Sequence, residues 1–290
     1  MRSQRYQDGA VDDVPVVDHV EGTLPASGLF WQTWVADAPP RAIVVLVHGA
    51  HEHGGRYAHV ASRFLESGYQ LYAIDHAGHG RSPGTRGNIG SMGATVGGVD
   101  ELARYAQAEH PGVPAFLYGH SFGGLVALQY VTGTPVALCG VVVSAPAVDV
   151  SAASPLQIKL SGLLSRLVPN AGVIKLDAET VSRDPEVVRD YTTDPLNFMG
   201  KMRARTGAEI LATVNAMGPR IAALRLPLLV LHGTADRLVP PTATDWVEAH
   251  AGSPDLTVKR YEGLYHEPHN EPEQKQVLDD IVAWMDAHLP

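Results

Sequence analysis

The stretch 116–124 (FLYGHSFGG) constrains the fold of this chain more than any other. It places the pattern Gly-x-Ser-x-Gly, centred on Ser121, between an apolar run at 115–118 that is typical of a buried strand and a helical stretch at 125–131. A chain turns this sharply from strand to helix only where small residues flank the turn, because side chains there would collide. The sequence therefore predicts a strand, a tight turn and a helix that together lift the Ser121 hydroxyl above the end of a sheet.

Strands and helices alternate along most of the chain. The first two strands are joined through Gly-Thr-Leu-Pro, which predicts an entry hairpin. The run AIVVLV at 42–47 is typical of a strand covered on both faces of a parallel sheet. Helices between the later strands imply right-handed crossovers and a mostly parallel central sheet. The expected strands are 16–20, 29–35, 42–47, 69–74, 115–118, 140–144, 228–231 and 257–261, and the expected helices are 57–66, 96–109, 125–131, 207–224, 242–251 and 273–288.

The alternation stops between 147 and 205. This segment holds several prolines, and we expect no strand in it. Its leucine-rich part at 156–168 has amphipathic character, so it forms either a buried helix or an exposed apolar surface that touches lipid. We interpret the segment as a helical cap inserted into one α/β core, with the core formed by 1–146 and 206–290 and the cap by 147–205.

Composition excludes several classes of protein. The net charge is −9, and no run of Lys and Arg interleaves with aromatic residues, so a nucleic-acid partner is not expected. The first residues contain no apolar segment, and no stretch approaches 18 apolar residues, so we expect neither a signal peptide nor a membrane span. Cys139 is the single cysteine and is compatible with a reducing compartment. A cytoplasmic protein is expected, with membrane contact limited to peripheral association through the cap.

Ser121 needs a base and an orienting acid to act as a nucleophile. In a fold of this kind the acid and the base follow the serine in that order along the chain. Asp236 follows the strand 228–231 and is assigned as the acid, while His266 is the first histidine after the strand 257–261 and is assigned as the general base. His269 is its nearest competitor. The alternatives are a turn-forming aspartate and a solvated serine in a glycine-rich turn.

Two backbone N–H groups are needed to stabilise the oxyanion that forms when a serine attacks an ester. The N–H of Phe122, directly after the nucleophile, is the first candidate. The second comes from the loop after the strand 42–47, and we assign it to Ala50. The alternative is that His48 and Gly49 only form a tight turn there.

A metal site is the competing interpretation of the histidine-rich loop at 48–55. His48, His51 and His53 cluster in sequence, but the pattern matches neither H-E-x-x-H nor H-x-x-E-H, and there are no paired cysteines. No metal is therefore expected.

Seven motifs in this chain resemble those of the monoacylglycerol lipase family of α/β-hydrolases, and the bacterial members most. They run in the family's order over nearly the whole chain: HGAHEHGGRY (48–57), DHAGHGRSPG (75–84), GHSFGG (119–124), SAPAV (144–148), SRDPEVVRDYTTDPL (182–196), HGTADRLVP (232–240) and YHEPHNE (265–271). The resemblance implies an α/β-hydrolase fold and hydrolysis of a monoacylglycerol to fatty acid and glycerol, without a cofactor, under a mobile cap that touches lipid.

The resemblance also implies roles for individual residues. Arg56, Tyr191 and His269 are expected to bind or release the glycerol group, and His120, beside the nucleophile, is added to this set. The chain departs from the family at Phe122, where methionine is common, and at His51, where a small residue or leucine is usual. These departures bear on the shape of the pocket.

Other functions share parts of this pattern. A lysophospholipase or a broad carboxylesterase would use the same three residues with a different pocket. A non-catalytic binding protein of the same fold would have lost one of Ser121, Asp236 and His266, and none is lost. A dehalogenase or an epoxide hydrolase would carry aspartate in place of the serine.

Overall fold

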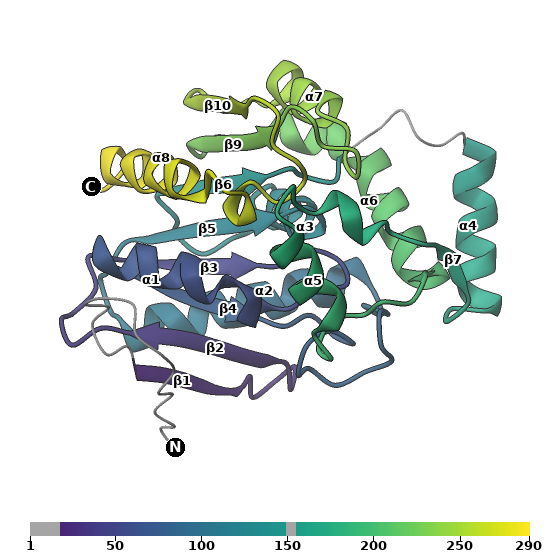
Figure 1. Ribbon diagram of the computed structural model, residues 1–290, viewed down its shortest axis with the longest axis horizontal. Coiled ribbons are helices and arrows are strands. Elements are labelled where there is room, and N and C mark those ends of the chain that lie inside the picture. The colour runs from purple at the N-terminus through teal and green to yellow at the C-terminus, as the bar shows by residue number, and fades with distance from the viewer. Residues whose placement is uncertain (1–17, 149–154) are drawn as a thin grey trace.

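An eight-stranded sheet with helices on both faces forms the centre of the molecule in a computed structural model that describes residues 18–148 and 155–290 (Figure 1). The strands of this sheet are β1 (Asp18–Thr23), β2 (Phe30–Val35), β3 (Ala42–Val47), β4 (Tyr69–Ile74), β5 (Ala115–His120), β6 (Gly140–Ser144), β9 (Leu228–Gly233) and β10 (Leu256–Tyr261). The helices of the core are α1 (Ala58–Glu66), α2 (Met92–Glu109), α3 (Phe122–Val131), α6 (Ala204–Ile221), α7 (Thr242–His250) and α8 (Gln274–Ala287), with 3-10 turns η1 (Gly54–Tyr57) and η4 (Pro268–Asn270). Within the described ranges no helix is long and apolar enough to cross a bilayer.

The strand order is β1-β2-β4-β3-β5-β6-β9-β10. The first two strands form the predicted hairpin, in which Asp18 pairs with Val35, and β2 joins β4 in antiparallel orientation. All pairs from β4 to β10 are parallel, so the predicted mostly parallel sheet is confirmed. β5 lies between β3 and β6, with Gly119 opposite Val47 and His120 opposite Ser144. The turn at Ser121 therefore lies at the middle of the sheet, where the carboxyl ends of parallel strands meet.

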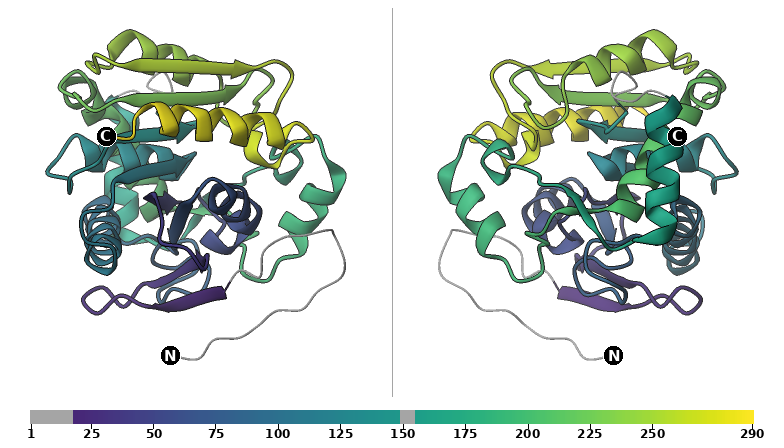
Figure 2. Two further views of the ribbon diagram at one scale, coloured as in Figure 1. Left: turned by 90° about the vertical axis from the view of Figure 1, so that its left-hand side faces the viewer. Right: turned by 90° about the vertical axis from the view of Figure 1, so that its right-hand side faces the viewer.

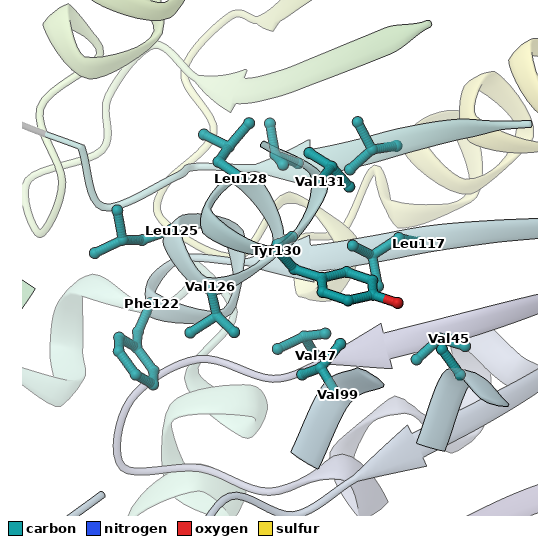
Figure 3. Packing of buried hydrophobic residues seen from close by; sticks show 14 of the residues in the cluster. Val45, Val47, Val99, Leu117, Phe122, Leu125, Val126, Leu128, Tyr130 and Val131 are labelled. Carbon is teal, nitrogen blue, oxygen red and sulfur yellow. The ribbon is translucent and has the colours of Figure 1, made fainter. Parts of the chain in front are cut away.

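The two faces of β3 explain its unbroken apolar sequence. Val45 and Val47 pack into a cluster with α2 and α3, whereas Val44 and Leu46 pack into a second cluster with α1 and α8. Helices cover both sides of the sheet as a result (Figure 2). Side chains of α3 such as Val126 lie over β3 and β5 (Figure 3). Each fully buried valine or leucine contributes about 1.5–3 kcal/mol, so these layers hold the central strands firmly in place.

Residues 155–203 lie beyond the carboxyl ends of the strands (Figure 1). They contain α4 (Pro155–Leu167), β7 (Gly172–Ile174), η3 (Ala178–Thr180), α5 (Pro185–Thr193) and β8 (Met202–Arg203). The expectation of no strand here is wrong, because β7 and β8 form a two-stranded antiparallel sheet. Strands of three and two residues, far apart in the chain, are too short to show the alternation by which strands are recognised.

α4 packs beside α6 but leaves much of its apolar surface uncovered. Leu163 is 55% exposed and Leu167 is 71% exposed. A helix buried throughout, one of the two alternatives for this segment, is therefore excluded at these positions.

Three helices of the core, α2, α3 and α6, start earlier than predicted. α3 starts at Phe122, directly after Ser121. α2 starts at Met92 because the Ser91 hydroxyl accepts a hydrogen bond from the Ala94 N–H at 3.2 Å and caps the helix. α6 starts at Ala204, whose N–H donates to the carbonyl of Ala171 at 2.8 Å, so the chain passes directly from β8 into the helix.

Candidate active site

Ser121 is the single residue between β5 and α3, with φ 53° and ψ −118°. A residue with a side chain adopts such a conformation only at a cost of about 1–3 kcal/mol, which the surrounding structure must offset. The Ser121 N–H donates to the carbonyl of Ser144 at 2.8 Å. A Cβ atom added to Gly119 would lie 2.4 Å from the carbonyl oxygen of Gly123, and one added to Gly123 would lie 2.0 Å from the carbonyl oxygen of Val47. The predicted steric need for these glycines is confirmed.

His266 and Asp236 are joined by a buried hydrogen bond, with His266 Nδ1 2.7 Å from Asp236 Oδ2. The same carboxylate accepts from His232 Nε2 at 3.0 Å and from the N–H groups of Leu238 and Val239 at 2.8 and 3.0 Å. Burial alone would raise the pKa of Asp236. The charge of His266 and these hydrogen bonds have the larger effect and lower the pKa, so the carboxyl group stays ionised. An ionised acceptor fixes the proton of His266 on Nδ1 and leaves Nε2 free to act as a base.

His266 lies next to His120, the residue before Ser121. The rings of His120 and His266 lie 4.8 Å apart, centroid to centroid, and His120 directly precedes Ser121. Among the described residues no hydrogen bond joins the Ser121 hydroxyl to His266. The structure thus brings the three predicted residues to one end of the sheet and connects two of them directly.

The two predicted oxyanion donors flank the serine. The Phe122 N–H is at the first position of α3, where a helix offers it no acceptor. Ala50 follows Gly49 in the loop after β3, and a Cβ at Gly49 would lie 3.3 Å from the Cβ of Ser121. This loop is held in shape by Glu52, whose Oε1 accepts from the Gly49 N–H at 2.6 Å. Both backbone segments can therefore face one small volume above the serine.

The ring of Phe122 lies in the core, where it is 1% exposed. It meets the edge of His76, with 5.4 Å between the ring centroids. The larger ring at this position is accommodated by apolar packing around α3.

A buried ion network connects the loop after β3, the loop after β10 and α5. The Arg56 guanidinium donates to Glu267 through two hydrogen bonds of 2.8 and 2.7 Å, and it also donates to Glu52. It lies 4.7 Å from the ring centroid of Tyr191 on α5. Because Glu267 directly follows His266, this network can fix the position of the base.

The guanidinium of Arg56 pairs with two carboxylates in this network, Glu52 and Glu267. Burial and the nearby charge of Glu267 raise the pKa of Glu52, although Arg56 acts against them. Burial also opposes ionisation of Glu267, but Arg56 outweighs it and the pKa of Glu267 is lowered. Loss of Arg56 would leave two carboxyl groups buried without a cation.

The predicted substrate-binding residues are largely buried. Arg56 is held in the ion network, and His120 is 1% exposed. His269 is fully buried and stacks on Tyr57, with 4.9 Å between ring centroids. Tyr191 is the member of the set that lines a small cavity beside the loop after β3.

His48 and His76, one from each of the loops at 48–55 and 75–84, form hydrogen bonds with the backbone. His48 Nδ1 donates to the carbonyl of Gly49 at 2.7 Å, and its Nε2 accepts from the N–H of His76 at 3.0 Å. His76 Nε2 in turn donates to the carbonyl of His48 at 3.1 Å. In the part of the chain that the structure describes, no three His, Cys, Asp or Glu side chains are arranged to hold a metal ion.

Three residues around the site were not predicted from the sequence. His232 supports Asp236, and Glu52 and Glu267 hold Arg56. His232 carried a signal, since it lies near the end of β9, four residues before the predicted acid. The two glutamates carried none, because the partner that joins them is not visible in a single sequence.

Comparison with known proteins agrees with this geometry. Residues 38–273 match the family model described as serine aminopeptidase, S33. A monoacylglycerol lipase of Mycolicibacterium smegmatis is 42% identical over 90% of this chain and 94% of its own length, and the phospholipase YtpA of Bacillus subtilis is 34% identical over 89% and 99%. The crystal structure of a monoacylglycerol lipase of Paleococcus ferrophilus superposes with a TM-score of 0.80 at 31% identity, over 90% of this chain and 99% of the other.

The family model, over residues 38–273, includes the serine turn and the segment between β6 and α6 but not β1 and β2. Identity above 30% over nine-tenths of the chain is sufficient to assign a family. The chain is a carboxylic ester hydrolase with the α/β-hydrolase fold and belongs to the monoacylglycerol lipase family.

Proposed function

We propose that this protein hydrolyses monoacylglycerols to a free fatty acid and glycerol. Ser121 Oγ attacks the ester carbonyl while His266 Nε2 takes its proton, and Asp236 stabilises the resulting imidazolium. The N–H groups of Phe122 and Ala50 bind the oxyanion. His266 then protonates the departing glycerol oxygen, which leaves an acyl ester on Ser121. Water, deprotonated by the same histidine, attacks this ester and releases the fatty acid.

One observation carries the proposal: a strained serine stands at the carboxyl end of the sheet next to a buried, hydrogen-bonded His–Asp pair. A serine that served only the turn would need neither the strain nor the pair. The substrate class is supported by the relatives, several of which are named monoacylglycerol or monoglyceride lipases.

Tyr191 is proposed to contact the glycerol group, because it lines the cavity near the loop after β3. Arg56, His120 and His269 are proposed to act indirectly, without contacting the glycerol group. They hold the loops that carry Ala50 and His266, as their burial and their contacts with those loops suggest.

The direct test is the turnover of 1-monooleoylglycerol, with release of oleate measured by chromatography. We expect efficient hydrolysis by the wild-type protein and none above background by Ser121→Ala. Absence of turnover by a folded wild-type protein, together with hydrolysis of other esters, would move the substrate assignment elsewhere.

A lysophospholipase is the second candidate, since a relative of 34% identity is named a phospholipase. 1-Oleoyl-lysophosphatidylcholine carries the same acyl chain and differs at the group on glycerol. Comparing kcat/KM for the two substrates isolates that group. Higher kcat/KM for the lysophospholipid would favour the second candidate.

The segment 147–205 is proposed to be a cap that contacts the lipid surface from which substrate comes. The exposed large apolar side chains of the described residues all lie in this segment: Leu160, Leu163, Leu164, Leu167, Val168, Val173, Ile174 and Met199. Apolar side chains gain free energy when they enter a lipid interface, and the exposed Arg166 can meet an anionic headgroup.

The contribution of two of these leucines to lipid binding can be estimated from their exposure. Full burial of a leucine yields about 1.5–3 kcal/mol, so the exposed fractions of Leu163 and Leu167 correspond to about 1 and about 1.5 kcal/mol. Replacing both with serine should weaken binding to phosphatidylglycerol vesicles about 50-fold. Hydrolysis of a short soluble ester should be unchanged, which serves as the control. Equal vesicle binding by the double variant would refute the lipid contact.

A further inference from the structure

His51 adopts a backbone conformation that is unfavourable for its side chain. Its φ is 69°, in the left-handed region that favours glycine. It directly follows Ala50, the proposed oxyanion donor. A strained residue next to a reaction centre points to a role for its side chain.

The imidazole of His51 is buried with one nitrogen unpaired. The residue is 2% exposed, and Nε2 has no hydrogen-bond partner among the described residues. The ring meets Phe198 edge to face, with 5.0 Å between centroids, and the carbonyl of His51 accepts from the Phe198 N–H at 2.8 Å. The side chain is thus held firmly, while a nitrogen that ordinarily pairs when buried is left without a partner.

His51 lines the same small cavity as Tyr191. The other walls are mostly apolar and include Val181, Met199 and Leu238, the last of which lies two residues after Asp236. The cavity has a volume of about 10 Å³. This space is sufficient for about one oxygen atom with its hydrogen.

The protonation state of His51 determines which chemical group can pair with it in the cavity. Burial, aided by the charges of His79 and Arg203, lowers the pKa of His51 to about 4, so the ring is neutral near pH 7 and carries one N–H and one lone pair. A hydrocarbon chain could pair with neither. A hydroxyl group both donates and accepts, so it can pair with Nε2 in either tautomer.

We propose that His51 is a specificity-determining residue whose Nε2 hydrogen-bonds a free hydroxyl of the glyceryl group of the substrate. This inference rests on the proposed monoacylglycerol hydrolysis and places one hydroxyl of the glyceryl group in the cavity between the loop after β3 and the cap segment. A site that is built to bind a hydroxyl discriminates against an ester that lacks one, because the buried nitrogen then stays unpaired.

The test compares two esters of one acid, 1-monooctanoylglycerol and methyl octanoate, on the same enzyme preparations. His51→Phe keeps a ring of similar size and removes the hydrogen bond. We expect the ratio of kcat/KM for the glyceryl ester to that for the methyl ester to fall about tenfold, or about 1.4 kcal/mol, with the methyl ester nearly unchanged. His51→Gln places an amide nitrogen near the position of Nε2 and should retain most of the ratio.

A matched control is His250→Phe, the same change at an exposed residue near the end of α7, which should leave both substrates unaffected. The ratio does not depend on the fraction of enzyme that is folded. An unchanged ratio in His51→Phe, or an equal loss on both esters, would overturn the inference, since the residue would then only shape the loop. If the wild-type protein cleaves methyl octanoate but not the glyceryl ester, the proposed function itself fails.

Discussion

Acidification from pH 7 to pH 5 should strongly destabilise this protein, because it buries histidines in their neutral form. Six histidines are at most 2% exposed and have lowered pKa values: His48, His51, His76, His79, His120 and His269. Burial is the main cause in each, and neighbouring histidines add to it at several. For His76 and His120 the pKa is about 3, and for His79 about 4.

The sign and size of the effect follow from proton linkage. An unfolded histidine has a pKa near 6.5, so between pH 6.5 and about 4 the unfolded chain binds protons that the folded chain does not. The free energy of unfolding therefore falls as the pH falls through this window. From pH 7 to pH 5 each such histidine contributes about 2 kcal/mol, and the six together about 10 kcal/mol, which is comparable with the whole stability of a typical domain.

Urea unfolding followed by circular dichroism at pH 8, 7, 6 and 5 measures this directly. We expect little change between pH 8 and 7 and a steep loss below pH 6.5. Acidic side chains with lowered pKa values, such as Asp236, destabilise the folded chain mainly below about pH 5, so the two contributions are separated between pH 8 and 5. A change of less than about 2 kcal/mol between pH 7 and 5 would mean that these histidines are not held neutral in the folded state.

Three further predictions concern the serine turn and the site around it. Ser121→Ala and Asp236→Asn should each lower kcat about 10⁴-fold with an unchanged circular dichroism spectrum, and near-normal turnover by folded Asp236→Asn would move the acid elsewhere. Where the chain stays folded, kcat/KM should rise with pH as the histidine base loses its proton, and a flat profile would count against a histidine base. Gly123→Ala should prevent folding or greatly lower Tm, because the added Cβ meets a backbone carbonyl at 2.0 Å; Gly97→Ala in α2, where nothing lies within 4 Å, is the matched control and should be neutral or slightly stabilising. Equal Tm for the two alanine variants would contradict the steric account.

The sequence predicted those parts of the structure that depend on short-range patterns. The apolar run of β3, the glycines around Ser121 and the alternation of strands and helices all follow from local rules, and the structure agrees with them. β7 and β8 escaped prediction because two strands of three and two residues gain their stability from pairing with each other, and Gly172 pairs with Arg203 far along the chain. Local propensity has little to say about such contacts.

The site also contains some residues that local patterns predict and others that depend on contacts between distant segments. Asp236 and His266 were chosen by their places after two strands, and the structure joins them by a hydrogen bond. The burial of Arg56 could not be foreseen, since it depends on Glu267, 211 positions away in the chain. Nothing in the sequence indicates the φ of His51, its burial or its unpaired nitrogen, which only the structure supplies.

The central claim is that ester hydrolysis proceeds through Ser121. Titration with a fluorophosphonate, which modifies activated serines, tests it when adduct formation and monooleoylglycerol turnover are measured on the same samples. We predict one adduct per chain, located on Ser121 by peptide mass spectrometry, and turnover that falls in proportion to labelling and reaches zero when labelling is complete. Full turnover in completely labelled protein, or an adduct on a different serine, would contradict the account.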